Sequence, residues 1–146
     1  MGDWHDNLLE DDDRIAALVR SLQRVAVLGV KPESHADQAA HYVARYLADR
    51  GADVVPVPVY FPEATEILGR PVFRRLVDVP GALDLVDVFR RPQDIPAHLP
   101  DLLEKRPRAV WFQLGIRNDA AAEVLARAGI QVVQDRCLKV EWAAYR

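Results

Sequence analysis

The sequence predicts an α/β protein with a Rossmann-like, doubly wound parallel sheet of about five main strands, arranged as a three-layer αβα sandwich. Short apolar runs alternate with helical segments of about 10 to 15 residues along most of the chain. Successive positions within the runs are apolar, which indicates strands buried on both faces. Because strand–helix–strand crossovers are right-handed, the intervening helices cover both faces of such a sheet.

The first 22 residues predict a helical extension that precedes the sheet. Asp6 or Asn7 is suited to cap a helix, and the acidic run "EDDD" at 10–13 is suited to begin a second helical stretch. The apolar positions of this extension are Leu8, Leu9, Ile15, Leu18, Val19 and Leu22.

The alternation of strands and helices begins after this extension. "RVAVLG" at 24–29 predicts the first strand, and "ADQAAHYVARYLADR" at 36–50 predicts a helix with one apolar stripe. The next run predicts a second strand at about 53–57, whose regular pairing ends at Pro56 and Pro58.

The middle of the chain is less regular, and the second half then repeats the alternation. "PEATEILG" at 62–69 predicts one or two helical turns, and 71–83 predicts a loop with a short extra strand. Asn118 is a favourable N-cap for the helix that Gly129 ends. The main elements expected here are a strand at 83–89, a helix at about 94–106, a strand at 108–115, a helix at 119–129 and a strand at 130–135.

Composition limits the classes of protein. With 146 residues, the chain is expected to form one domain, 1–146, whose Rossmann-like core spans 24–142. A net charge of -3 argues against nucleic-acid binding. The acidic N-terminus and the short apolar runs argue against a signal peptide and a membrane span, so a cytoplasmic location is expected.

Cysteine and histidine usage gives no sign of a metal site. Cys137 is the one cysteine, which excludes an internal disulfide and a cluster of thiolate ligands. The four histidines lack a ligand spacing such as HExxH. We therefore expect no metal, and we interpret Cys137 as a packed thiol while leaving its reactivity open.

Ligands of doubly wound sheets bind at the carboxyl ends of the strands. Those ends carry several cations, and the planar fork of arginine suits phosphate oxygens. In "FRRP", neighbouring side chains of an extended chain point opposite ways, so Arg90 is expected to face a ligand and Arg91 the solvated margin. Pairing of both with nearby carboxylates is the alternative. The cations at the strand ends are Lys31, Arg90, Arg91, Arg117 and Arg136.

Nucleotide motifs are incomplete in this sequence. Gly29 stands alone after the first strand, without the second and third glycines of a dinucleotide fingerprint. The second strand ends in Val57, Pro58 and Val59, where an NAD ribose needs a carboxylate. The GxxxxGK[ST] loop of nucleotide hydrolases is absent as well.

The segments "DLVDVFRRPQDIP" and "AVWFQLGIRNDAAAEVLARAGIQVVQDRCLKVE" resemble the small stand-alone CoA-binding proteins. These are similar to the CoA-binding N-terminal domain of the succinyl-CoA synthetase alpha subunit, and the resemblance covers 24–142. It implies that CoA lies across the strand ends. The phosphorylated ADP part is then near the first two strands, and the pantetheine arm runs past the third and fourth.

The resemblance also implies which residues bind the cofactor. The sequence departs from the family at Lys31, where a small hydroxyl residue is usual, and in "PVPVYFPEA", which replaces PVNP with a longer loop. The residues implied are Gly29, Val30, Lys31, Pro56, Val57, Phe89, Arg90, Gln113, Gly115, Ile116 and Asn118.

Three functions are compatible with these observations. The first is a CoA or acyl-CoA binding module without activity of its own, because no His, Ser or Cys pair has the spacing of a nucleophile and its base. The second is a partner-dependent component of an acyl-CoA ligase or transferase. In the synthetase that the family resembles, the phosphorylated histidine belongs to a second domain. The third is an NAD(P)-linked redox sensor.

Overall fold

The computed structural model describes residues 2–146 and confirms the doubly wound parallel sheet. Met1, the first residue of the expected extension, lies outside the described residues. The main sheet has the strand order β2-β1-β5-β6-β7, and every pairing within it is parallel. Its strands are β1 (Arg24–Leu28), β2 (Asp53–Val57), β5 (Leu85–Val88), β6 (Ala109–Phe112) and β7 (Gln131–Val133).

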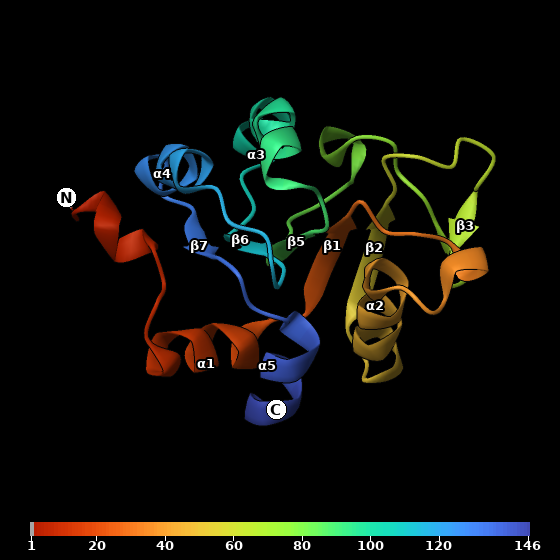
Figure 1. Cartoon of the computed structure of the whole chain (residues 1–146), viewed down its shortest axis with the longest axis horizontal. Helices are drawn as coiled ribbons and strands as arrows, with labels where there is room; N and C mark the ends of the chain where they lie inside the picture. Colours follow the sequence, from red (N-terminus) through yellow and green to blue (C-terminus); the bar gives the residue numbers. More distant parts are fainter. Residues whose placement is uncertain (1) are drawn as a thin grey trace.

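Helices cover both faces of the sheet, which confirms the three-layer sandwich (Figure 1). The helices α1, α2 and α5 contribute to one apolar cluster, whereas α3 and α4 contribute to the other. Among residues 2–146, none of these helices has the length and apolarity needed to cross a membrane. Their bounds are α1 (Asp12–Ser21), α2 (Ala39–Asp49), α3 (Leu99–Lys105), α4 (Asp119–Arg127) and α5 (Leu138–Tyr145).

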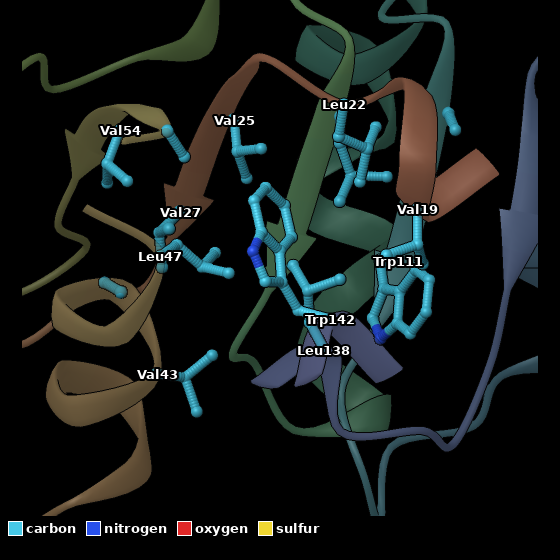
Figure 2. Packing of buried hydrophobic residues seen from close by; sticks show 14 of the residues in the cluster. Val19, Leu22, Val25, Val27, Val43, Leu47, Val54, Trp111, Leu138 and Trp142 are labelled. Atoms are coloured by element: carbon cyan, nitrogen blue, oxygen red, sulfur yellow. The ribbon is translucent and has the colours of Figure 1, made fainter. Parts of the chain in front are cut away.

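The layer beneath α1, α2 and α5 is packed around two tryptophans (Figure 2). Trp142 of α5 lies near Val25 and Val27 of β1, while Trp111 projects from β6 beside Val19 of α1. Trp142 is 3% exposed and Trp111 is fully buried. Burying a large aromatic side chain stabilises a fold by about 2 to 3 kcal/mol, so α5 is an integral part of the core. The helix α5 is an addition to the elements expected from the sequence.

The N-terminal segment differs from the expected extension. Trp4–Asn7 forms a short 3-10 helix capped by Asp3, so neither Asp6 nor Asn7 begins a helix through Leu8 and Leu9. Leu8 bridges to Val132 instead, and the Leu9 N–H donates to the Val132 carbonyl at 2.9 Å. The segment covers the exposed edge of β7, an interaction that helical periodicity cannot reveal.

The acidic run does start a helix, as expected. The Asp11 carboxylate accepts a hydrogen bond from the Arg14 N–H and caps α1, and the carboxylates of Asp12 and Asp13 lie in its first turn. The buried face of α1 includes Ile15 and Val19, which belong to the same cluster as Trp142.

The expected helical turns at 62–69 are wrong. Glu66–Ile67 and Arg70–Pro71 form an antiparallel hairpin, β3 and β4, next to the edge strand β2. Leu68 and Gly69 form its two-residue turn with φ angles of 58° and 70°, the positive values that such turns require. Leucine seldom adopts this conformation, so Leu68 is not a residue from which a turn is predicted.

Two further elements depart in detail from expectation. The helix expected at 94–106 begins as a 3-10 helix, Pro92–His98, and becomes α-helical only in α3, because Pro96 and Pro100 lack N–H donors. Pro56 does not end the pairing of β2 and lies within it, opposite Val27. Proline is tolerated there because β2 is an edge strand of the main sheet.

Asp87 is the one carboxylate-bearing side chain among the buried residues of the described chain. It lies in register with Val27 and Trp111 on the central strand β5, and neither carboxyl oxygen has a hydrogen-bond partner within residues 2–146. Burial raises the pKa of this carboxyl well above its usual value. The Asp87 side chain is therefore held as a neutral acid inside the sheet.

We predict that Asp87→Asn raises the free energy of unfolding at neutral pH but not near pH 3. A carboxyl whose pKa is raised by folding stays protonated in the native state while the unfolded state releases its proton. The contribution of Asp87 to the free energy of unfolding therefore decreases as pH rises from the pKa of this carboxyl in the unfolded state through its pKa in the folded state. Urea unfolding of both proteins from pH 3 to 8 measures the difference, which should grow with pH. A difference independent of pH would contradict a neutral Asp87.

Candidate functional site

The strand order places the candidate site between β1 and β5. The order reverses there, because β2 lies on one side of β1 and the later strands β5, β6 and β7 follow on the other. The chain leaving β1 continues to α2 on one face, whereas the chain leaving β5 continues to α3 on the opposite face. Connections that diverge in this way open a crevice at the carboxyl ends of the strands.

Gly29 brings the two diverging chains into contact. Its φ angle is 87°, and a Cβ atom at this position would lie 2.4 Å from the Phe89 carbonyl oxygen. The Gly29 N–H donates to the Val57 carbonyl, and the Phe89 N–H donates to the Leu28 carbonyl, each at 2.9 Å. Contact between the chains thus requires glycine whether or not a ligand is bound.

A cavity of about 200 Å³ opens beside this contact. We call it the switch cavity. Its lining includes Gly29, three cationic residues and three aromatic residues. Its lining residues are Gly29, Val30, Lys31, Tyr60, Phe61, Phe89, Arg90 and Arg91.

Arg90 is directed into the structure and is held by polar neighbours. Its side chain is 14% exposed, and its Nε donates to His98 Nε2 at 3.1 Å. Asp94 Oδ2 lies 3.7 Å from Arg90 Nη2, and the guanidinium carbon lies 5.3 Å from the centre of the Tyr60 ring. Arg90 thus carries a charge at the switch cavity in a restrained position.

Arg91 has a different environment. Its side chain is 70% exposed, and its Nε donates to Asp94 Oδ2 at 2.8 Å. This hydrogen bond is the main reason that the pKa of Asp94 is lowered. Burial opposes it, and the charges of Arg91 and Arg90 add to the lowering. Arg91 is thus much more exposed than Arg90, as expected of a side chain at the solvated margin. Both arginines nevertheless contact Asp94 and line the switch cavity, so the alternative of pairing with a nearby carboxylate also applies.

His98 belongs to this arrangement, although it is not among the site residues expected from the sequence. Because the Arg90 guanidinium can only donate, His98 Nε2 must accept and carry no proton. Burial and then the charge of Arg90 lower the pKa of His98, which favours this neutral form. The spacing of eight residues from Arg90 gave no sequence signal, because a 3-10 helix interrupted by proline lies between them.

The loop after Gly29 is fixed by α2. The Lys31 N–H donates to the Ala40 carbonyl at 3.0 Å, and the Lys31 carbonyl lies 2.9 Å from His41 Nδ1. Lys31 Nζ donates to Gln38 Oε1 at the mouth of the switch cavity. Buried His41 therefore braces the loop, and Val30 is 1% exposed within the core cluster.

The other expected site residues lie outside the lining of the switch cavity. Val57 is fully buried, and the Pro56 carbonyl accepts a hydrogen bond from the Phe73 N–H. The buried side chain of Gln113 accepts from the Leu138 N–H at 2.9 Å, at the start of α5. Asn118 Oδ1 caps α4 by accepting from the Ala121 N–H, as expected.

The loop 113–118 lies at the carboxyl end of β6 and is braced by the loop after β7. The Gly115 N–H donates to Asp135 Oδ1 at 2.7 Å, and the Asp135 N–H donates to the Ile116 carbonyl. Asn118 Nδ2 also donates to the Pro92 carbonyl at 2.9 Å. The Gln113 side-chain oxygen and both polar atoms of the Asn118 side chain are thus engaged within the protein. Exposed Gly115 and half-buried Ile116 offer mainly apolar surface.

Arg117 and Arg136 do not join the other cations at the strand ends. They line a separate cavity of about 300 Å³ near β7. Arg117 pairs with Asp119 at 3.0 Å, and Arg136 contacts both Asp12 and Glu141. These carboxylates largely balance both guanidinium charges, so the switch cavity is the better candidate for binding an anion.

Comparison with protein families gives one match across most of the chain. The family described as a CoA binding domain matches residues 23–143. The uncharacterized protein YneT of Bacillus subtilis (strain 168) is 31% identical over 129 residues, which are 88% of this chain and 92% of YneT.

Solved structures show the same fold. A Thermus thermophilus protein has a TM-score of 0.85 and 37% identity, covering 94% of this chain and all of that one. A hypothetical protein of Pyrococcus horikoshii OT3 has a TM-score of 0.82 and 29% identity, with coverage of 93% and 92%. The dinucleotide-forming acetyl-coenzyme A synthetase 1 of Ca. Korarchaeum cryptofilum has a TM-score of 0.64 at 18% identity, and the match covers 80% of this chain but 27% of that one.

We predict that Gly29→Ala lowers the free energy of unfolding by about 2 to 4 kcal/mol, since it adds a backbone clash to an unfavourable φ angle. For a chain of this length the melting temperature should fall by about 6 to 12 °C. Gly51→Ala is the matched control, because Gly51 has a φ of 93° and open space around its Cα. Calorimetry compares the two, and equal losses would show that the Phe89 carbonyl is not the constraint.

Proposed function

The chain belongs to the CoA-binding domain family, and on this premise we propose that it binds coenzyme A or an acyl-CoA at the carboxyl ends of β1 and β5. The observation that carries the proposal is the switch cavity, in which Arg90 presents a restrained positive charge beside the tight turn at Gly29. Charged hydrogen bonds to phosphate are the interactions for which arginine is best suited.

The size of the switch cavity indicates how CoA lies. Coenzyme A is larger than about 200 Å³, so the cavity accommodates only one part of it. We place the phosphate-bearing end beside Lys31 and Arg90. The remainder follows the strand ends toward exposed Gly115 and half-buried Ile116, whose apolar surface suits an uncharged arm.

We infer that the chain has no catalytic activity by itself. His98 is engaged as an acceptor for Arg90, and His41 contacts a backbone carbonyl. Cys137 packs against the core cluster at the start of α5. These contacts stabilise structure and pair no nucleophile with a base. The cytoplasmic location expected from the N-terminal residues stays a prediction.

A second candidate is a partner-dependent component of an acyl-CoA ligase or transferase. One observation favours it: this chain matches 27% of the length of the acetyl-coenzyme A synthetase, where the fold is joined to additional protein. The NAD(P)-linked alternative has less support, because Val57 is buried at the end of β2, where a ribose-binding carboxylate is needed.

We predict that Arg90→Ala weakens CoA binding about 10- to 150-fold, the equivalent of ~1.5 to 3 kcal/mol for a charged hydrogen bond. Arg91→Ala is the matched control, and its effect should be clearly smaller because this side chain is exposed and paired with Asp94. Titration calorimetry at fixed salt measures both, with melting curves to verify folding. Equal effects of the two substitutions would contradict the assignment of Arg90 to the site. NAD binding as tight as CoA binding would contradict the assignment of CoA as the cofactor.

We also predict no turnover when the purified chain is mixed with acetyl-CoA or succinyl-CoA, a nucleoside triphosphate and magnesium. The physical reason is that His41, His98 and Cys137 make structural contacts, and none of these contacts pairs a nucleophile with a base. Chromatographic detection of free CoA over hours provides the measurement. Steady release that follows the protein through further purification would support an enzyme instead.

A further inference from the structure

We infer that Tyr60 is the platform on which the adenine base of the ligand stacks, so that the switch cavity takes the nucleotide end of CoA. This inference rests on the proposed function and adds a specificity-determining residue to it. Tyr60 lies in the loop that follows β2, is 61% exposed and lines the switch cavity together with Phe61. An exposed aromatic ring at the edge of a cavity offers a face to a planar base.

The loop that carries Tyr60 is held in an unfavourable conformation. Phe61 has a φ angle of 65°, a value that a bulky residue rarely adopts. The Arg74 guanidinium donates to the Phe61 and Pro62 carbonyls at 3.2 Å each and also to the Ala64 carbonyl. Strain maintained by such bonds is typical of functional sites, where it positions a neighbouring group in advance.

A second contact fixes the same loop from the opposite side. The Phe61 ring meets His35 edge to face, with centroids 5.0 Å apart and an interplanar angle of 62°. Glu33, two residues before His35, accepts a hydrogen bond from the Leu68 N–H at 3.0 Å. The segment after β1 and the segment after β2 therefore form one wall of the switch cavity, and Tyr60 is presented at its rim.

The charges beside Tyr60 indicate which end of the ligand belongs there. Lys31, Arg90 and Arg91 line the same cavity, and the Arg90 guanidinium carbon is 5.3 Å from the Tyr60 ring centre. A ligand that places a flat base next to phosphate groups satisfies both features. The adenosine end of CoA has this chemistry, whereas its pantetheine arm is flexible and uncharged.

The test compares two ligands, CoA and 4′-phosphopantetheine, which lacks the adenosine. Titration calorimetry is carried out on the wild type, Tyr60→Ala and Tyr60→Phe. Tyr42→Ala is the matched control, because Tyr42 is 40% exposed on α2 and does not line the switch cavity. We expect Tyr60→Ala to weaken CoA binding about 10-fold, within the range for base stacking on an aromatic ring. Phosphopantetheine binding should stay unchanged.

Tyr60→Phe should bind CoA like the wild type, because it retains the ring. Equal weakening of both ligands by Tyr60→Ala, or no weakening of either, would overturn the stacking role while leaving CoA binding intact. A third outcome is that the wild type binds adenosine 3′,5′-bisphosphate but not CoA, and that Tyr60→Ala loses this binding. This outcome would support the stacking role and refute the proposed function. Binding of none of these ligands would refute both.

Discussion

The contact between Gly29 and the Phe89 carbonyl is the constraint on which the site depends. At this point the chain leaving β1 turns toward α2 and the chain leaving β5 turns toward the opposite face of the sheet. A Cβ atom at Gly29 would meet the carbonyl at 2.4 Å and force the two chains apart. Glycine lets them remain in contact, and Lys31 and Arg90, which follow β1 and β5, consequently line one small cavity.

The two arginines of "FRRP" interact unequally with the same carboxylate, that of Asp94. Asp94 bonds closely to exposed Arg91 at 2.8 Å and lies 3.7 Å from the better buried Arg90. The closest polar contact of Arg90 is the neutral imidazole of His98, which orients the guanidinium without cancelling its charge. The positive charge therefore stays available to an anion at the switch cavity, and Arg91 stays at the solvated margin.

The buried polar residues have unequal roles. Gln113 accepts from the first N–H of α5, and His41 contacts the Lys31 carbonyl, so each braces a segment next to the strand ends. Asp87 has no such partner in the described chain and is held neutral within the apolar layer. Hydrogen-bonded polar groups thus position the rim of the site, while the unpartnered carboxyl costs stability at neutral pH.

The sequence by itself determined the parallel sheet, its central strands, α2, and α4 with its Asn118 cap, because apolar periodicity and capping are properties of neighbouring residues. The resemblance to CoA-binding proteins was also visible in the sequence, in the segments around "VDVFRRP" and "WFQLGIRN". The sequence also predicted that Arg91 lies at the solvated margin, where its side chain is far more exposed than that of Arg90. Only the tertiary structure decided that Leu8 and Leu9 pair with β7, that 66–71 forms a hairpin, and that Tyr60 and His98 join the site. Each of these depends on contacts between distant segments or on a strained turn, and local sequence patterns do not record such contacts.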